Sequence, residues 1–550
     1  MSLFTASLYP RSGLGFLGLD STCPIWSRKK LIFDLELIVL GASLHDILTR
    51  LKAEPQRFPK LDLVYSLSDP IQDPVVVALP ANGLQLRFDG PKQQLRLIEV
   101  VDFTKNQIVL KPNDKELYLV RAPNTGTNGT SPAPAITEAA GGPTFRHIYQ
   151  RYLGPTYNGE FIPDPQDSRA PGTYVLSYPG VAFTFPMLPA DYSPEKDVVS
   201  LMSSSTLPQI ATSMAVFHGD SWAATRANMW TEELPSIRTF APLAKGKDVC
   251  PDDISIVVVH GGGKLTLSRT PSGDDVWIQL GETTPQELVA RLGPPDAIYR
   301  KNDQRMYVHK LRAASNTMSR PNGNDLKRPE DWPDTDQSSA HATSDDQDSS
   351  DEAVEEDLVA NVSGECFYNY FYMGFDILMS APTAPSRAPP SQRDLDDTQA
   401  LPSIKSAAPD RLVATKLVLH GNVPGSYPFN RHRRCRWAIS YLQEGDGLDD
   451  GTFQGPSSET PFPQVEERLK REWKSIYASE EEARQQQRGM VLNRGWGDSP
   501  GSSCELLGGW EESGDGNAHS KEDSTTTLYG FPGLVFEVLK NGYVSALTVY

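Results

Sequence analysis

The sequence has few cysteines and no long hydrophobic run. Its five cysteines are odd in number and widely spaced, without a Cys-x-x-Cys pair, which predicts reduced thiols in a cytosolic protein. No stretch of about 18 uncharged apolar residues occurs, so we expect no transmembrane segment. The N-terminus has no basic start followed by an apolar core, and we therefore expect no secretory signal and a cytoplasmic location.

The sequence also lacks the motifs of common enzyme classes. Gly-x-Ser-x-Gly, His-Glu-x-x-His and Gly-x-Gly-x-x-Gly are all absent. The run Gly261–Lys264 is similar to part of a phosphate loop, but Val258 and Leu265 stand where that loop needs a glycine and a Ser or Thr. A β-turn is therefore favoured there. The nine histidines are scattered and form no zinc-like pair with cysteine. We predict no enzyme activity, no catalytic residues, no cofactor and no metal site.

Hydrophobic residues make up only 38% of the chain, which is low for a packed protein. Long polar insertions explain this deficit better than a weak core does. A large share of the net charge of −18 lies in these insertions, and the acidic balance argues against nucleic-acid binding. We predict linkers or disordered insertions at 123–142, 312–362 and 381–409, with further polar insertions over much of 444–464 and 495–526.

Four glycines each open a short apolar or aromatic stretch in which the apolar positions largely alternate, as in a half-buried β-strand. They are Gly83, Gly180, Gly374 and Gly533. Glycine suits a tight turn or a positive φ before such a strand. A helical pattern precedes each stretch and another alternating run follows it, which indicates a repeated supersecondary unit. Chance similarity among ordinary α+β segments is the alternative.

The helical patterns carry start and stop signals. Ser43 is placed to cap a helix, either Thr283 or Thr284 is placed to cap another, and Pro285 suits the first turn of the latter. We therefore predict an α+β protein built from four related helix-plus-antiparallel-strand units with disordered insertions. The predicted divisions are 1–122 for the first unit with an N-terminal extension, 123–142 for a linker, 143–280 for the second unit and following strands, 281–421 for the third unit, and 422–550 for a basic segment and the fourth unit.

A basic segment, RHRRCRW at Arg431–Trp437, is the first candidate interaction site. It holds four arginines and a histidine in an acidic chain and closely follows an aromatic turn. Such a patch suits an anionic lipid headgroup or an acidic partner surface. The alternative is a basic edge strand that uses charge to resist aggregation. The candidate interaction residues are Tyr427, Phe429, Arg431, Arg433, Arg434, Arg436 and Trp437.

An aromatic run, CFYNYFYMGFDIL from Cys366, is the second candidate site. Read as a strand, it places aromatic side chains on both faces, which favours a central strand between two layers. A groove for a ligand or a protein is the other interpretation. The two predicted faces are Phe367, Asn369, Phe371 and Met373 on one side and Tyr368, Tyr370 and Tyr372 on the other.

Several of these segments together resemble the phagosome assembly factor family. The resemblance is carried by the aromatic run, by TKLVLHGNVPGSYPFNRHRRCRW from Thr415 and by GFPGLVFEVLKNGYVSALTVY from Gly530. It extends to GASLHDIL from Gly41 and to GTYVLSYPGVAFTFP from Gly172, and it covers most of the chain outside the insertions. The departures are chiefly the long insertions themselves and an N-terminal segment that interrupts the lead into the first unit.

The resemblance implies a non-enzymatic adaptor or regulator of autophagy. Family members associate with a WD-repeat β-propeller protein and are recruited with it to the preautophagosomal structure, where phosphatidylinositol 3-phosphate marks the membrane. The resemblance thus implies indirect membrane contact, and it brings no catalytic residues to carry over. Two alternatives stay open, namely a direct phosphoinositide-binding protein and an unrecognised lipid-modifying or hydrolytic enzyme.

Overall fold

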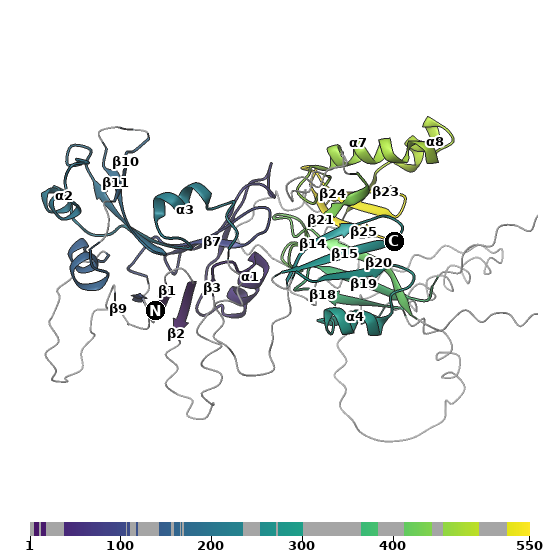
Figure 1. Ribbon diagram of the computed structural model, residues 1–550, viewed down its shortest axis with the longest axis horizontal. Helices are drawn as coiled ribbons and strands as arrows, with labels where there is room; N and C mark the ends of the chain where they lie inside the picture. The colour runs from purple at the N-terminus through teal and green to yellow at the C-terminus, as the bar shows by residue number, and fades with distance from the viewer. Residues whose placement is uncertain are drawn as a thin grey trace, which may run out of the picture.

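The computed structural model describes two halves of the chain that lie side by side (Figure 1). The described residues are 5–9, 13–17, 38–105, 107–110, 117–118, 142–155, 159–165, 167, 170–234, 253–270, 273–300, 365–382, 412–442, 455–493 and 525–550. The predicted linker and the two predicted disordered insertions lie outside these residues, apart from Gly142, Ala381 and Pro382.

The described part of the first half runs to residue 234 and contains strands, three α-helices and one helical turn. In chain order these are β1 (Thr5–Tyr9), β2 (Gly13–Leu17), β3 (Ile38–Val39), α1 (Leu44–Ala53), β4 (Asp62–Val64), β5 (Val75–Leu79), β6 (Leu84–Phe88), β7 (Leu95–Val100), β8 (Gln107–Leu110), β9 (Leu117–Tyr118), the helical turn η1 (His147–Tyr152), β10 (Glu160–Ile162), β11 (Gly172–Tyr178), β12 (Val181–Met187), α2 (Val198–Ser204), β13 (Ser213–Phe217) and α3 (Trp222–Asn228).

The second half begins at Asp253 and follows a similar order of elements. These are β14 (Asp253–Val259), β15 (Lys264–Thr270), β16 (Asp275–Gln279), α4 (Pro285–Leu292), β17 (Ala297–Arg300), β18 (Cys366–Tyr370), β19 (Phe375–Ser380), β20 (Val413–His420), β21 (Trp437–Ile439), η3 (Ser440–Leu442), α7 (Phe462–Glu472), η4 (Trp473–Ile476), α8 (Glu480–Gln486), β22 (Met490–Asn493), β23 (Thr525–Phe531), β24 (Leu534–Leu539) and β25 (Val544–Val549).

Each half contains one eight-stranded antiparallel sheet, in the orders β10-β11-β12-β13-β7-β6-β5-β4 and β17-β18-β19-β20-β25-β24-β23-β22. Each sheet is two four-stranded meanders joined by their last strands, because β7 pairs with β13 and β20 pairs with β25. Two smaller sheets have the orders β3-β2-β1-β8-β9 and β16-β15-β14-β21. In these, β1 pairs with β8 and β14 pairs with β21 in parallel. The predicted α+β fold is confirmed.

The four repeat-defining glycines occupy equivalent places in this topology. Gly83, Gly180, Gly374 and Gly533 have φ of +63°, +78°, +85° and +75°, a region that favours glycine. Each directly precedes the third strand of a meander, and that strand pairs with the closing strand of the same meander. At Gly83 and Gly374 the space is also closed, since an added Cβ would lie 2.4 Å from the Asp102 oxygen and 2.3 Å from the Arg433 oxygen. That the four meanders are copies of one repeated unit stays a prediction.

The helix starts follow the capping signals in the sequence. The Ser43 hydroxyl accepts a hydrogen bond from the Asp46 backbone N–H and starts α1. At α4, Thr284 rather than Thr283 is the cap, and it forms a capping box with Glu287. The helix α7 begins at Phe462, inside the stretch predicted to be largely polar insertion, and it buries Phe462, Val465 and Leu469.

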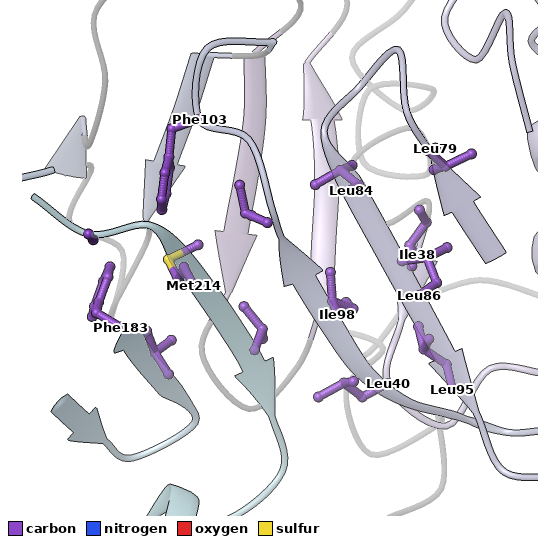
Figure 2. Packing of buried hydrophobic residues seen from close by; sticks show 14 of the residues in the cluster. Ile38, Leu40, Leu79, Leu84, Leu86, Leu95, Ile98, Phe103, Phe183 and Met214 are labelled. Atoms are coloured by element: carbon purple, nitrogen blue, oxygen red, sulfur yellow. The ribbon is translucent and has the colours of Figure 1, made fainter. Parts of the chain in front are cut away.

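Each half has its own hydrophobic core. In the first half, helix α1 buries Leu44, Ile47, Leu48 and Leu51 among the strands, and full burial of such a side chain contributes about 1.5–3 kcal/mol. Figure 2 shows Ile98 and Met214 of this core on neighbouring strands, close to buried residues of β6. The second core joins α4 and α7 to the sheets of the second half. The packing of both halves therefore follows the helix-on-sheet scheme expected from the sequence.

Two predicted features differ from the structure. The aromatic run is not one central strand, because a turn at Phe371–Gly374 divides it into β18 and β19. The chain reverses direction at this turn because β18 and β19 pair antiparallel, and Gly374 supplies the positive φ that the turn requires. Strands β14–β16, which the predicted divisions group with the second unit, instead form one sheet with β21 of the second half, to which β14 pairs.

Candidate interaction site at the seam between the halves

The loop Gly421–Arg436, which connects β20 to β21, lies against the first half and forms most of the seam between the halves. The Gln93 side chain donates to the Asn422 carbonyl oxygen at 2.8 Å, and the Asn422 amide donates back to the Gln93 Oε1 at 2.9 Å. Both residues are buried. Phe429 of this loop is packed in the core of the first half. The loop therefore fixes the two halves to each other.

Arg434 makes three hydrogen bonds to backbone carbonyl oxygens at this seam. Its guanidinium donates to Pro91 at 2.7 Å, to Gly421 at 2.6 Å and to Ser458 at 3.3 Å. Burial lowers the pKa of Arg434 to about 10, so the side chain stays charged at neutral pH. Pro91 belongs to the first half and the other two acceptors to the second. One buried cation thus joins three backbone segments.

Arg433 pairs with carboxylates from both halves. Its guanidinium contacts Asp46 at the start of α1 and Asp253 at the start of β14. Burial raises the pKa of Asp46, but a hydrogen bond from His45 and the charge of Arg433 outweigh it and bring the pKa to about 2. Burial lowers the pKa of Arg433, and the two carboxylates outweigh this and raise it above its ordinary value.

The other predicted interaction residues are also engaged at or near this loop. Arg436 donates to Glu459 at 2.6 Å. Trp437 is buried and begins β21, and the Arg431 guanidinium lies 5.7 Å from the centre of the Tyr427 ring. All seven predicted residues therefore lie in the seam loop or directly after it.

The arginines do not form the predicted exposed anion-binding patch. Arg433, Arg434 and Arg436 contact carboxylates or carbonyl oxygens within the protein. The alternative of a basic edge strand also fails, because the arginines precede β21 instead of lying in it. The segment is internal because its partners, at positions as distant as 46, 91 and 253, come to it through the fold.

A second cluster in the same region contains Asp376 of β19, His420 at the end of β20 and His432 of the seam loop. His420 Nε2 lies 2.8 Å from one Asp376 carboxylate oxygen, and His432 Nε2 lies 3.0 Å from the other. The two imidazole rings stack with centroids 3.7 Å apart and planes 13° from parallel. The side chains of all three are less than one fifth exposed. Nothing in the spacing of 376, 420 and 432 signals this cluster in the sequence.

The protonation of the cluster follows from its contacts. Burial raises the pKa of Asp376, but the hydrogen bonds from His420 and His432 outweigh it and hold the pKa well below its usual range. Burial and the nearby His420 lower the pKa of His432 to about 4. An ionised carboxylate only accepts hydrogen bonds, so each histidine donates an Nε2–H hydrogen bond to Asp376.

Two surface cavities are lined by residues outside this cluster. One, of about 420 Å³, is lined by residues that include His218, Asp220 and Glu232. The other, of about 350 Å³, is lined by residues that include Lys264, Trp277 and Glu287. Among the described residues, neither lining gathers three ligand-type side chains as closely as Asp376, His420 and His432 do. No helix among the residues that the structure describes has the length and apolar character to cross a membrane.

The two outer strands of the second large sheet expose apolar side chains. Ile298 and Tyr299 of β17 are 56% and 50% exposed, and Met490 and Val491 of β22 are 58% and 66% exposed. Among the residues that the structure describes, these strands have a neighbouring strand on one side only. Exposed apolar side chains beside unpaired backbone groups are typical of surfaces to which another chain adds a strand.

Comparison with known families gives a match over most of the chain. The sequence model of the family described as phagosome assembly factor 1 matches residues 34–117, 132–325 and 410–550. These blocks include the seam loop, both large sheets except β18 and β19, and the helices α1, α4 and α7.

Relatives in other organisms match at low identity over long stretches. A PHAF1 protein of Arabidopsis thaliana is 21% identical over 521 residues, which cover 93% of this chain and 89% of the plant protein. A PHAF1 protein of Drosophila melanogaster is 19% identical over 527 residues, covering 93% and 90% of the two chains. A PHAF1 protein of Caenorhabditis elegans is 21% identical over 418 residues, covering 73% and 74%. No solved structure matches the chain significantly.

Proposed function

The chain belongs to the phagosome assembly factor 1 family, and from this premise we propose that it is a non-enzymatic adaptor that binds a WD-repeat β-propeller protein during autophagy. The observation that carries the proposal is the family match, which spans both halves of the fold. In this proposal the propeller partner recruits the chain to the forming autophagosome and supplies the contact with phosphatidylinositol 3-phosphate. A phagosome assembly factor role agrees with the resemblance found in the sequence.

The exposed edge strands supply a surface that suits an adaptor. A partner strand added to β17 or β22 would pair with the outer backbone groups of that strand and cover the apolar side chains beside them. Exposed edge strands of this kind favour aggregation unless they are covered or charged, so a bound partner would also protect the protein from aggregation. We place the partner contact at these two edges of the second half.

Direct lipid binding receives no support from the arginine segment. Charge attraction to a phosphoinositide needs exposed basic residues, and Arg433, Arg434 and Arg436 are each engaged within the protein. Reversal of these charges would break the seam, so such a variant would report on folding and not on lipid binding. Flotation of the unmodified chain with phosphoinositide liposomes is the cleaner test, and we expect no salt-sensitive flotation without the partner.

The partner contact is tested by co-purification of the tagged full chain from cells, followed by binding of the purified propeller protein. The edge variants are Ile298→Lys with Tyr299→Lys, and Met490→Lys with Val491→Lys. We expect a WD-repeat β-propeller protein to co-purify and at least one double variant to weaken binding by about tenfold or more, since lysine on an edge strand opposes strand addition.

Val289→Lys is the matched control, because Val289 is an exposed apolar residue of the same half that lies on helix α4. It should bind the propeller protein as the unmodified chain does. If no propeller protein is enriched, the adaptor proposal is wrong. If one binds equally to both edge variants, the partner is right and the contact surface is wrong.

A further inference from the structure

We propose that Asp376, His420 and His432 form a binding site for a divalent transition metal ion, with zinc as the principal candidate. The inference is independent of the proposed adaptor function. Two imidazoles and one carboxylate are the ligand types of many zinc sites that keep a fourth position for water. The three ligand atoms, one from each residue, all lie within 4.8 Å of one another.

The distances allow an ion to enter with a small rearrangement. With bonds of about 2.1 Å in a tetrahedral arrangement, two zinc ligands lie about 3.4 Å apart. In the structure each histidine Nε2 is 2.8–3.0 Å from an Asp376 oxygen, slightly closer than that. The ligand atoms therefore need to move by roughly an ångström to surround an ion. The parallel ring stack already aims both Nε2 atoms at the same carboxylate.

Binding changes the position of two protons. Each histidine donates an Nε2–H hydrogen bond to Asp376, whereas a metal ion needs the lone pair of that nitrogen. Each imidazole therefore binds the ion as the tautomer with its proton on Nδ1, and the ion takes the place that the two Nε2 protons occupied between the side chains. A divalent ion adds two positive charges beside the Asp376 carboxylate.

The chemistry of the ligands selects the class of ion. Imidazole nitrogen suits zinc, copper, iron and nickel, whereas calcium and magnesium prefer sites made of oxygen atoms. Two of the three ligands here are imidazoles, so an alkaline-earth ion is a poor fit. The described cluster also excludes thiolate ligands, since buried Cys435 lies outside the group of three ligand atoms.

An ion at this site would fasten the seam loop to the second large sheet. Asp376 and His420 belong to neighbouring strands of that sheet, whereas His432 belongs to the loop. The next two residues of the loop, Arg433 and Arg434, contact the first half. Metal binding is thus coupled to the seam, and it should raise the temperature of thermal unfolding because the ion binds the folded state only.

The experiment uses the full chain without a histidine tag. Elemental analysis of the purified protein gives the zinc content, and after removal of metal with a chelator, zinc is added back in a calorimetric titration while cobalt is followed by its visible absorbance. We expect about one zinc ion per chain, cobalt bands typical of a low-coordinate site, and a higher unfolding temperature with zinc than with chelator.

His420→Gln and His432→Gln are the test variants, because a glutamine amide N–H still donates to Asp376 while binding metal poorly. Each should weaken zinc binding by more than about 100-fold, since even the loss of a residue that merely supports a ligand costs 10–100-fold. His218→Gln is the control, because His218 follows the closing strand β13 and lies outside the cluster. It should bind zinc as the unmodified chain does.

The result for the unmodified chain decides the proposal even if a variant fails to fold. No stoichiometric zinc, together with no cobalt bands after reconstitution, overturns the site. Zinc binding that the two cluster variants retain at full affinity, with their unfolding transitions intact, overturns it as well and assigns the ion to other residues.

Discussion

Replacement of Arg434 by methionine is the strongest single perturbation that the seam offers. Methionine is unbranched, apolar and of similar volume, so it fills much of the space of the side chain but donates no hydrogen bond. The three carbonyl oxygens of Pro91, Gly421 and Ser458 then lose their shared donor. A hydrogen bond to a charged group contributes about 1.5–3 kcal/mol, and a buried acceptor without a partner costs about 1–3 kcal/mol.

The gain from no longer burying the charge offsets part of this loss. Removing one member of a buried charged network typically costs about 3–5 kcal/mol in total, and we expect Arg434→Met to lower the free energy of unfolding by that amount. The free energy of unfolding of Arg434→Lys should lie between those of the unmodified chain and Arg434→Met. An ammonium keeps the charge but cannot span three acceptors as a planar guanidinium does. Urea unfolding followed by tryptophan fluorescence measures both.

Arg484→Met is the matched control, because the Arg484 side chain on α8 is 80% exposed and pairs with Glu480 of its own helix. Its effect should stay within about 0.5 kcal/mol. If Arg434→Met lowers the free energy of unfolding by less than about 1 kcal/mol while the control is silent, the Arg434 contacts do not stabilise the seam and the reasoning is refuted.

Three further predictions concern other parts of the fold. The pKa of Asp46 is depressed to about 2 from 3.8, so its contribution of about 2 kcal/mol is present above pH 4 and lost as the pH falls to 2; the stability difference from Asp46→Asn should shrink over that range in acid titrations of unfolding. Gly83→Ala should cost at least about 2 kcal/mol more than Gly273→Ala in urea unfolding, because both glycines have positive φ but only Gly83 would place its Cβ against a backbone oxygen. Deletion of 316–357 should leave the unfolding temperature nearly unchanged in a thermal scan, because this polar, acidic sequence has little apolar area to bury; a large drop would show that it packs on the fold.

Local signals in the sequence gave correct local structure. Ser43 and Thr284 cap helices because a hydroxyl one step before an amphipathic segment satisfies free backbone N–H groups, and this depends on nearby residues alone. The glycine before each third strand is similarly local, because the tight turn needs a positive φ. Gly374 also lies within the aromatic run, and the turn that it predicts is present there in place of a single continuous strand.

The candidate sites were harder to predict because their partners are distant in the chain. The arginine segment reads as a solvated basic patch until Asp46, Asp253 and Glu459 are brought to it by the fold. The His420 and His432 contacts with Asp376 depend on the register of β19 with β20 and on the path of the seam loop. Neither can be read from the spacing of the residues, because tertiary contacts set both.

Recruitment in cells that lack the WD-repeat β-propeller partner tests the central claim most directly. The fluorescently tagged full chain is followed during starvation, together with a marker for phosphatidylinositol 3-phosphate membranes. The adaptor account predicts that the chain gathers at these membranes in normal cells, stays diffuse without the propeller protein, and returns when that protein is restored. Undiminished recruitment in its absence would contradict the account.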